Sequence, residues 1–201
     1  MKIESVLIVG CGGLGGFVSE ELCRLNLKKI TLIDGDTFSI ENMNRQLFCS
    51  STTLGKNKAQ VVKTGIQDKC NSDIVAIPSF LDDSNINILA DVDLVIDCCD
   101  NIKTRLLLES SCLQYNKILI HGGIEGLVGQ VCICYPGDNT LSRLYKNNPG
   151  KKVLTYSYSV ATIASFEVAL VHKLMTEENL PYKNKMIFID MDSLSTSIVN
   201  V

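Results

Sequence analysis

The chain of 201 residues lacks three features that would each assign it to a broad class of proteins. No apolar run reaches the ~18 to 20 residues of a membrane-spanning helix, which argues against an integral membrane protein. No long basic run accompanies the formal net charge of −3, which argues against a dedicated binder of nucleic acid or of membrane surfaces. No C-x-x-C pair occurs, so the paired thiolates of a common structural zinc site are absent.

The nine cysteines are numerous, yet they do not predict disulfide bonds. The opening segment "MKIESVLIVG" is typical of a strand that enters a glycine turn, with no signal peptide before it. We therefore expect reduced thiols and a cytoplasmic protein. The length suits one domain with a substantial core, so residues 1–201 are predicted to form a single domain.

Short apolar runs alternate with helical patterns along the chain. Runs typical of buried parallel strands span residues 5–10, 30–34, 73–80, 93–99 and 117–124. Helical patterns span residues 14–25, 55–69, 83–91, 101–116 and 159–175, and further strand-like runs span 129–136, 185–192 and 195–199. This order predicts a Rossmann-like α/β fold, in which a mainly parallel sheet has helices on both faces and an antiparallel C-terminal portion. The polar residues 137–156 are predicted to be a flexible loop.

A glycine-rich turn follows the first strand. Gly10, Gly12 and Gly15 form G-x-G-x-x-G between a strand and a helix, and Asp34 stands nineteen residues after Gly15 at the end of the second strand. Glycines at these positions let the backbone approach a phosphate at a helix N-terminus, and the aspartate is placed to hold ribose hydroxyls. The pattern predicts a nucleotide without saying which one. A glycine turn without a ligand is the less favoured alternative.

A polar segment, "DGDTFSIENMNRQLF", separates the second strand from its helix. If this segment is helical, Asn42, Arg45 and Gln46 share one face. An arginine beside two amides suits a polyphosphate, because the guanidinium binds phosphate oxygens bidentately. A surface helix with a solvated arginine is the alternative.

Lys56 and Lys58 begin the next helical pattern, where the helix dipole already favours anions over cations. Two cations at this position are better explained if an anion lies nearby. We therefore predict that Lys58 is a phosphate ligand and that Lys56 supports it. The alternative for each is an exposed lysine, and it is a strong one for Lys56.

Carboxylates gather at the end of a later strand, in "LVIDCCDN". Asp97, Asp100 and Asn101 are placed at the sheet edge where α/β proteins bind ligands. A carboxylate opposite phosphate-binding cations suits magnesium, which bridges carboxylates and phosphates. Either Asp100 or Asn101 is expected to cap the following helix. Cys98 and Cys99 are expected to be buried instead of reactive.

The ordered set "GCGGLGG", "DGD", "NMNRQ", "GKNK" and "DCCDN" resembles the ThiF/MoeB/HesA family, the bacterial relatives of ubiquitin-activating enzymes. The resemblance extends over nearly the whole chain, because "GGIEGLVGQVCICYPG" and "FIDMDSLS" also match. It implies a homodimeric nucleotidyltransferase that uses ATP and magnesium. Such an enzyme transfers AMP to the C-terminal Gly-Gly carboxylate of a ubiquitin-like sulfur carrier protein and releases pyrophosphate.

The resemblance also implies roles for individual residues. The nucleotide-facing positions would be Gly10, Gly12, Gly13, Gly15, Asp34 and Asp36, with Asp34 on the ribose. The triphosphate would be held by Asn42, Arg45 and Lys58, with Gln46 and Asn101 in support. Asp100 would position magnesium.

The chain departs from the family pattern in its cysteines. Family members carry two C-x-x-C pairs for a structural zinc, so no zinc is expected here. The segment "LSRLYKNNPGKKVLTYSYS" before the late helix lacks the cysteine that many members use after adenylylation. We therefore expect an enzyme that stops at the acyl adenylate. The short chain without zinc cysteines favours the thiamine-pathway carrier, ThiS, as substrate.

Two alternatives stay open. A relative that activates another carboxylate, such as a peptide C-terminus or a carbamoyl-modified tRNA base, would use the same site, although the low basicity argues against tRNA. An NAD-binding oxidoreductase or a non-catalytic dinucleotide-binding module would explain the glycines and Asp34. It would leave Arg45, Lys58 and Asp100 without a role.

Overall fold

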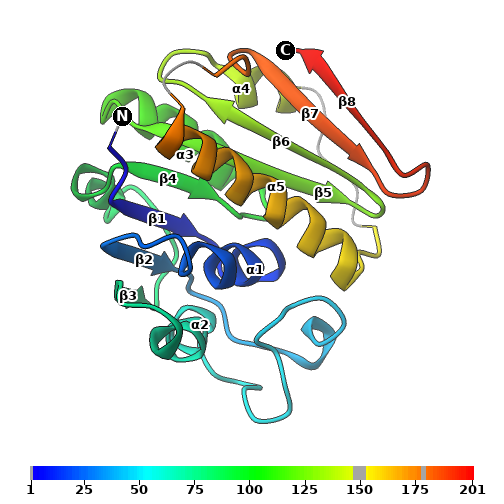
Figure 1. Ribbon diagram of the computed structural model, residues 1–201. Coiled ribbons are helices and arrows are strands. Elements are labelled where there is room, and N and C mark those ends of the chain that lie inside the picture. The colour runs from blue at the N-terminus through cyan, green and yellow to red at the C-terminus, as the bar shows by residue number, and fades with distance from the viewer. Residues whose placement is uncertain (1, 147–152, 178–179) are drawn as a thin grey trace.

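The computed structural model of the chain describes residues 2–146, 153–177 and 180–201. These residues form one eight-stranded sheet, with the strand order β3-β2-β1-β4-β5-β6-β7-β8 (Figure 1). The strands are β1 (Ser5–Val9), β2 (Lys29–Ile33), β3 (Asp73–Ile77), β4 (Leu94–Asp97), β5 (Ile118–Glu125), β6 (Val128–Cys134), β7 (Lys185–Asp190) and β8 (Ser195–Asn200). Strands β3, β2, β1, β4 and β5 are parallel, and β6, β7 and β8 continue the sheet antiparallel. The predicted fold class is confirmed.

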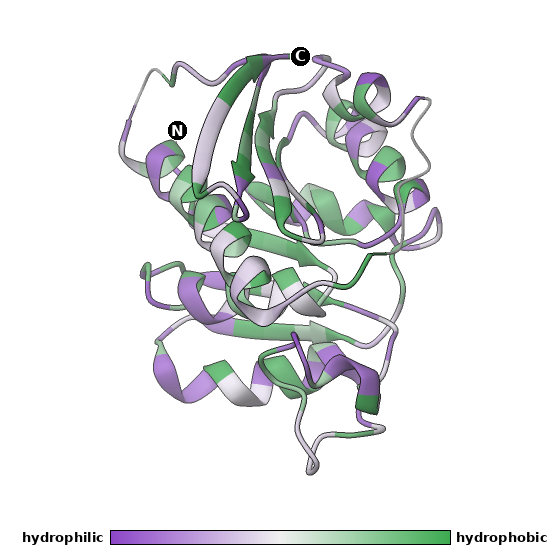
Figure 2. Ribbon diagram, turned by 90° about the vertical axis from the view of Figure 1, so that its right-hand side faces the viewer, coloured by the Kyte–Doolittle hydropathy of each residue, from purple (hydrophilic) through white to green (hydrophobic). Residues whose placement is uncertain are grey.

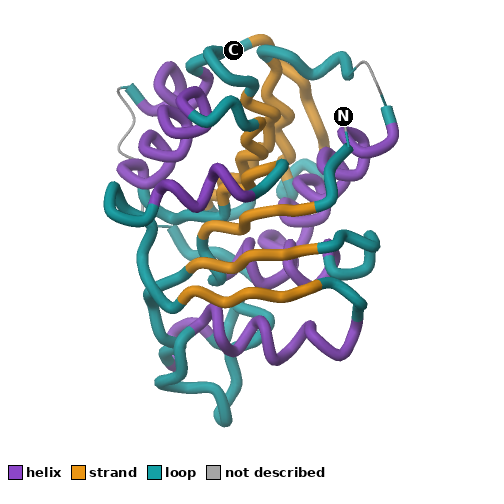
Figure 3. The backbone as a smooth tube through the Cα atoms, turned by 90° about the vertical axis from the view of Figure 1, so that its left-hand side faces the viewer, coloured by secondary structure: helices purple, strands orange, loops and turns teal. Residues whose placement is uncertain are grey.

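The helices cover both faces of the sheet, as Figure 3 shows. They are α1 (Gly13–Leu22), α2 (Lys58–Ile66), α3 (Ile102–Gln114), α4 (Thr140–Tyr145) and α5 (Ser157–Thr176), with 3-10 turns η1 (Ile40–Asn42), η2 (Gln67–Lys69) and η3 (Ile86–Asp91). Helices α1, α2 and α5 pack in one hydrophobic cluster, and α3, α4 and η3 pack in the other. None of the helices in the described ranges is long and apolar enough to cross a membrane.

The central strands are hydrophobic on both sides because both faces are covered. In β1, Val6 and Ile8 belong to the cluster under α1 and α5, whereas Leu7 and Val9 belong to the cluster under α3. This alternation follows from the two-residue period of a strand. Figure 2 shows that the strands of the sheet are predominantly hydrophobic.

The chain reverses its direction across the sheet next to β1. From β1 it proceeds to β2 and β3 on one side, and it then returns through β4 to β5 on the other side. The carboxyl ends of β1 and β4 therefore diverge into loops that lead to opposite faces, which opens a crevice at this edge. The glycine turn after β1 and the acidic segment after β4 both lie there.

The prediction of an uninterrupted loop over residues 137–156 was wrong for residues 140–145, which form α4. The reason is a tertiary contact, since the carboxylate of Glu109 on α3 accepts hydrogen bonds from the backbone N–H groups of Leu141 (2.6 Å) and Ser142 (2.9 Å). Leu141 is also buried in the cluster under α3. Residues 147–152 of this segment lie outside the described part of the chain.

Candidate functional site

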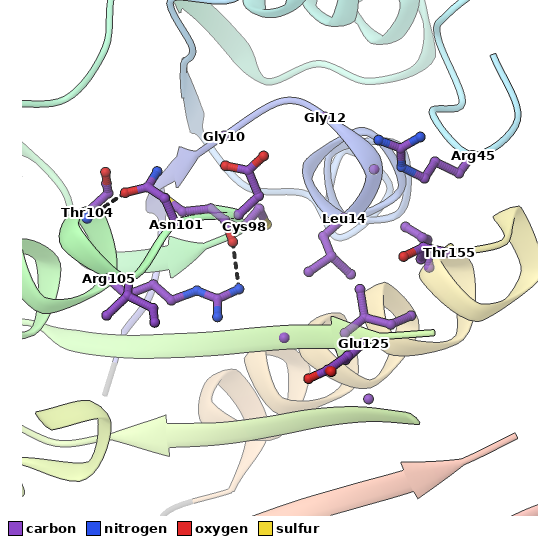
Figure 4. Close-up of a pocket in the computed structure, with 18 of the residues that line it drawn as sticks. Gly10, Gly12, Leu14, Arg45, Cys98, Asn101, Thr104, Arg105, Glu125 and Thr155 are labelled. Carbon is purple, nitrogen blue, oxygen red and sulfur yellow. Dashed lines mark hydrogen bonds between the residues drawn. The ribbon is translucent and has the colours of Figure 1, made fainter. Parts of the chain in front are cut away.

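A pocket of about 1140 Å³ lies at the carboxyl ends of the parallel strands (Figure 4). Its floor is the glycine turn after β1. One end is formed by Asp34, Asp36 and Lys58, and the other by the β5–β6 hairpin and residues 153–155. The pocket therefore extends across several strands and has room for a ligand larger than one phosphate group.

The glycine turn has the geometry of a phosphate-approach turn. Gly10 has φ +92°, and a Cβ atom there would lie 2.7 Å from the carbonyl oxygen of Cys98. Gly12 is the N-cap of α1, so the free N–H groups of the first helical turn are directed toward the pocket, which Gly12 and Gly13 line. Gly15 does not line the pocket. A Cβ on Gly15 would lie 1.8 Å from the carbonyl oxygen of Gly10, so this glycine permits close packing of helix and turn.

Asp34 lines the pocket and also braces the turn. Its Oδ2 accepts a hydrogen bond from the N–H of Cys11 (2.6 Å), and its Oδ1 accepts one from the N–H of Asp36 (2.8 Å). Partial burial raises the pKa of the Asp34 carboxyl. The carboxylate retains lone pairs for a ribose hydroxyl, because each oxygen has more than one acceptor site.

Lys58 is buried, with 7% of its surface exposed, and its Nζ lies 3.0 Å from Oδ2 of Asp36. It begins α2, where the side chain of Asn57 caps the helix by accepting a hydrogen bond from the N–H of Gln60. Lys56 is exposed and does not line the pocket. The structure thus places Lys58 in the site and gives Lys56 the position of an ordinary surface lysine.

The segment after β2 is a 3-10 turn followed by irregular backbone. Some of its side chains line the pocket, and others hold the turn together. Arg45 and Gln46 line the pocket, and Gln46 lies against Gly12. The Nη1 group of Arg45 donates to the carbonyl oxygen of Glu41 (2.9 Å). Asn42 does not line the pocket, because it is buried and its Oδ1 accepts a hydrogen bond from the N–H of Ser39 (3.1 Å). The predicted common face therefore joins Arg45 to Gln46 without Asn42.

Asp100 and Asn101 both line the pocket just beyond β4. Asn101 is the cap of α3, since its Oδ1 accepts a hydrogen bond from the N–H of Thr104 (2.9 Å). Asp100 is exposed to the pocket. Within the described ranges, no group of three or more His, Cys, Asp or Glu side chains is arranged to hold a metal ion. The residues fit magnesium only as one carboxylate that completes the coordination of a phosphate-bound ion.

A buried polar network, which the sequence did not reveal, adjoins the pocket. Asp97 is fully buried, and its Oδ2 lies 2.7 Å from Nδ1 of His121. The Nε2 of His121 lies 3.0 Å from the hydroxyl of Tyr145. That hydroxyl accepts hydrogen bonds from Nη1 of Arg105 (2.6 Å) and Nε2 of Gln130 (2.9 Å).

Burial sets the protonation states within this network. It lowers the pKa of His121, although the hydrogen bond to Asp97 opposes it. Burial raises the pKa of Asp97, but the hydrogen bond with His121 and the neighbouring charges together lower it by more. The net shift of the Asp97 pKa is therefore downward. The pKa of Tyr145 is raised to about 12, chiefly by burial. An ionised Asp97 beside a neutral His121 fixes the imidazole proton on Nδ1, so Nε2 accepts the hydrogen bond from Tyr145.

The cysteines beside the site are buried thiols. Cys98 and Cys99 are each 8% exposed, and burial raises the pKa of both thiols well above the ordinary value. The prediction that both are buried is confirmed. A thiol with a raised pKa is a poor nucleophile, so neither has the environment of a reactive cysteine.

The chain is similar in sequence to a known protein family and to several of its members. The model of the ThiF family matches residues 1–201. Molybdopterin-synthase adenylyltransferase of Escherichia coli (strain K12) is 30% identical over 207 residues, covering 94% of this chain and 80% of that protein. Protein HesA of Nostoc sp. is 26% identical over 204 residues, covering 96% of this chain and 79% of that protein.

Solved structures with the same fold include E. coli MccB with MccA-N7isoAsn, at a TM-score of 0.84 and 23% identity. The match covers 98% of this chain but only 64% of the MccB chain. A structure of E. coli MccB with ATP matches at a TM-score of 0.81 and 24% identity. At these identities the likeness shows a shared fold.

Proposed function

The chain belongs to the ThiF family, and on this premise we propose that it is an ATP-dependent adenylyltransferase. Its substrate would be the C-terminal Gly-Gly carboxylate of a ubiquitin-like sulfur carrier protein, and pyrophosphate would be released. The observation that carries this proposal is the pocket itself, which joins a glycine turn at a helix N-terminus to Arg45, Lys58 and Asp100. Several relatives are named adenylyltransferases, which supports the reaction type.

The arrangement of charges suits attack by a carboxylate on the α-phosphate. The nucleophile is already ionised, so the reaction needs positioning and charge neutralisation more than a general base. Arg45 and Lys58 would neutralise the triphosphate, while Asp34 would bind the ribose. Asp100 would hold magnesium, whose charge would stabilise the departing pyrophosphate. An NAD pyrophosphate would leave these cations and Asp100 without a comparable task.

The hairpin end of the pocket suits an extended glycine tail. Gly123, Gly126 and Gly129 line it, together with Leu154 and Thr155 from the start of the last crossover. A Cβ on Gly129 would lie 2.0 Å from the buried side chain of Ile163, so this glycine permits close packing of α5 on the hairpin. The β4–β5 pairing ends at Asp97 and His121, so the backbone of residues 123–125 has β6 on one side and offers its other edge to a narrow peptide end.

Two carriers are candidates for the substrate. The short chain without zinc cysteines favours the thiamine-pathway carrier, whereas relatives such as the E. coli protein are named molybdopterin-synthase adenylyltransferases. We therefore propose a sulfur carrier as the substrate class and test both carriers. Homodimerisation and a cytoplasmic location remain predictions from the resemblance and the sequence.

The test is pyrophosphate–ATP exchange with magnesium and each of the two Gly-Gly carriers. Exchange that depends on one carrier and disappears when its last glycine is removed is the expected result. Exchange with a carrier-unrelated peptide instead would move the substrate to the peptide class. Absence of exchange with all these substrates, together with a rise in melting temperature on addition of NAD, would overturn the proposal.

A further inference from the structure

Arg105 is the cation of the pocket to which the proposed phosphate site assigns no task. Arg45, Lys58 and Arg105 are the cations among the described residues that line the pocket. Lys58 pairs with Asp36, which follows β2, whereas Arg105 donates to the carbonyl oxygen of Cys99, which follows β4 (2.7 Å). Strand β1 and its glycine turn separate these two positions. Lys58 and Arg105 therefore lie on opposite sides of the glycine turn.

The guanidinium of Arg105 extends from α3 toward the middle of the pocket (Figure 4). Among the described residues, its terminal nitrogens each use one N–H, to Cys99 and to Tyr145. The buried Nε lies 3.9 Å from Oδ2 of Asp97, so the second N–H of each terminal nitrogen remains for a ligand, and these two donors match the two oxygens of a carboxylate. The side chain is 12% exposed, so an anion bound here would be shielded from water.

The neighbours of Arg105 keep it in this orientation. The Tyr145 hydroxyl accepts from Arg105 and Gln130 and donates to His121, so its two lone pairs and its one proton are all used. His121 is itself anchored by the buried Asp97. Arg105 also lies over the Tyr145 ring, 5.1 Å from its centroid. A side chain held on two sides loses little entropy when a ligand binds.

We propose that Arg105 binds the C-terminal carboxylate of the acyl substrate, and that Tyr145 is the positioning residue that orients Arg105. This rests on the proposed function, in which a carboxylate has to reach the nucleotide from the β5–β6 hairpin. Arg105 lies between the glycine turn and that hairpin, since the Tyr145 hydroxyl that accepts from Arg105 also accepts from Gln130 on β6. A carboxylate entering along the hairpin would meet Arg105 before it reaches the α-phosphate.

The direct test is a titration of the whole protein, labelled with 15N arginine, with N-acetyl-Gly-Gly and with its C-terminal amide. The chain has four arginines, so the Arg105 Nε–H signal is readily assigned. We expect the acid to shift this signal in a saturable way, at an affinity about tenfold or more above that of the amide. Equal shifts with both peptides, no shift, or a shift with ATP alone would overturn the proposal.

Variants separate this inference from the proposed function. Tyr145→Phe should raise the KM for the carrier about tenfold and leave the KM for ATP unchanged, because the lost hydroxyl contacts Arg105, Gln130 and His121 and none of the proposed phosphate ligands. Arg105→Lys keeps the charge near Asp97 and should lose the preference for acid over amide, whereas Lys103→Ala on the exposed side of α3 should keep it. If the acid alone shifts the Arg105 signal but no pyrophosphate exchange occurs, the proposed adenylyltransferase activity is wrong and the carboxylate site at Arg105 is supported. If exchange occurs but the Arg105→Lys protein still binds the acid more tightly than the amide, the carboxylate site at Arg105 is wrong and the proposed activity is supported.

Discussion

Two lysines two residues apart give the sharpest prediction at the scale of single residues. Lys58 is buried against Asp36 and lines the pocket, whereas Lys56 is exposed outside it. Lys58→Ala should lower the rate of pyrophosphate exchange by roughly 100-fold or more, since it removes a preorganised charge from the site of phosphate transfer. Stability should change little, because the partner Asp36 remains solvated.

Lys56→Ala is the matched control, with the same chemical change at the edge of the same helix. Its exchange rate should equal that of the wild type. Circular dichroism melting of all three proteins would show that the comparison concerns folded enzymes. An equal loss of activity in both variants would mean that general positive potential, and not a contact by Lys58, supports the reaction.

Glu167 is a second residue with a measurable consequence. It is 0% exposed in the middle of α5, and burial raises the pKa of its carboxyl well above 4.5. The folded protein therefore keeps a proton that the unfolded chain releases above pH 4.5. The contribution of this group to stability is complete below that pH, and it falls by about 1.4 kcal/mol per pH unit above it until the folded-state pKa is reached.

Glu167→Gln replaces the acid by an uncharged group of the same shape and removes this titration. The melting temperature of the variant relative to the wild type should therefore rise steadily as the pH is raised above about 4.5. Thermal unfolding at several pH values would measure the difference. Parallel profiles for the two proteins would show that Glu167 does not hold its proton in the folded state.

At the scale of elements, the junction of β1 and α1 depends on one glycine of an adjacent pair. A Cβ on Gly15 would meet the Gly10 carbonyl oxygen at 1.8 Å, whereas the nearest atom to a Cβ on Gly16 lies at 3.5 Å. Gly15→Ala should destabilise the protein by about 3 kcal/mol through overpacking. Gly16→Ala should be neutral or stabilising by about 0.5 to 1 kcal/mol, because alanine favours a helix. Urea unfolding would measure both, and equal effects would contradict this account of the turn.

Most elements could be predicted because their signals are local. The buried strands β1, β2 and β4 are continuous apolar runs, and α1 and α5 have clear apolar stripes. Helix α4 has no such signal. It has only six residues, and the contact that stabilises it comes from Glu109, about thirty residues earlier in the chain. Long-range contacts of this kind are not visible in a local pattern.

The candidate site, like the fold, could be predicted only where the signal is local in the sequence. The motifs that contain Arg45, Lys58 and Asp100 converge on one pocket because each follows the carboxyl end of a parallel strand or lies in the loop after it. Asn42 was misplaced, since its amide is used by the turn in which it lies. Arg105 had only a weak signal, one helical turn after the capping Asn101. Its partner Tyr145 had none, because it belongs to α4.

At the scale of the whole molecule, the pocket connects parts of the sheet that are distant in sequence. Its lining comes from the loops after β1, β2 and β4 and from the β5–β6 hairpin. A ligand that fills the pocket therefore contacts both sides of the point where the strand order reverses. Such a ligand binds the folded state alone, because the unfolded chain does not bring these loops together.

Thermal stability should therefore distinguish the two nucleotide hypotheses. Magnesium and ATP together, at about 100 times the dissociation constant, should increase the free energy of unfolding by about 2.7 kcal/mol. This increase should raise the melting temperature by roughly 5 to 10 °C. Magnesium alone should have no effect, because the described residues offer it no cluster of three acidic, cysteine or histidine ligands. Asp100→Asn should reduce the part of the ATP effect that depends on magnesium, because the ion loses its protein ligand and keeps the phosphates. A rise with NAD as large as that with magnesium and ATP would favour the oxidoreductase alternative.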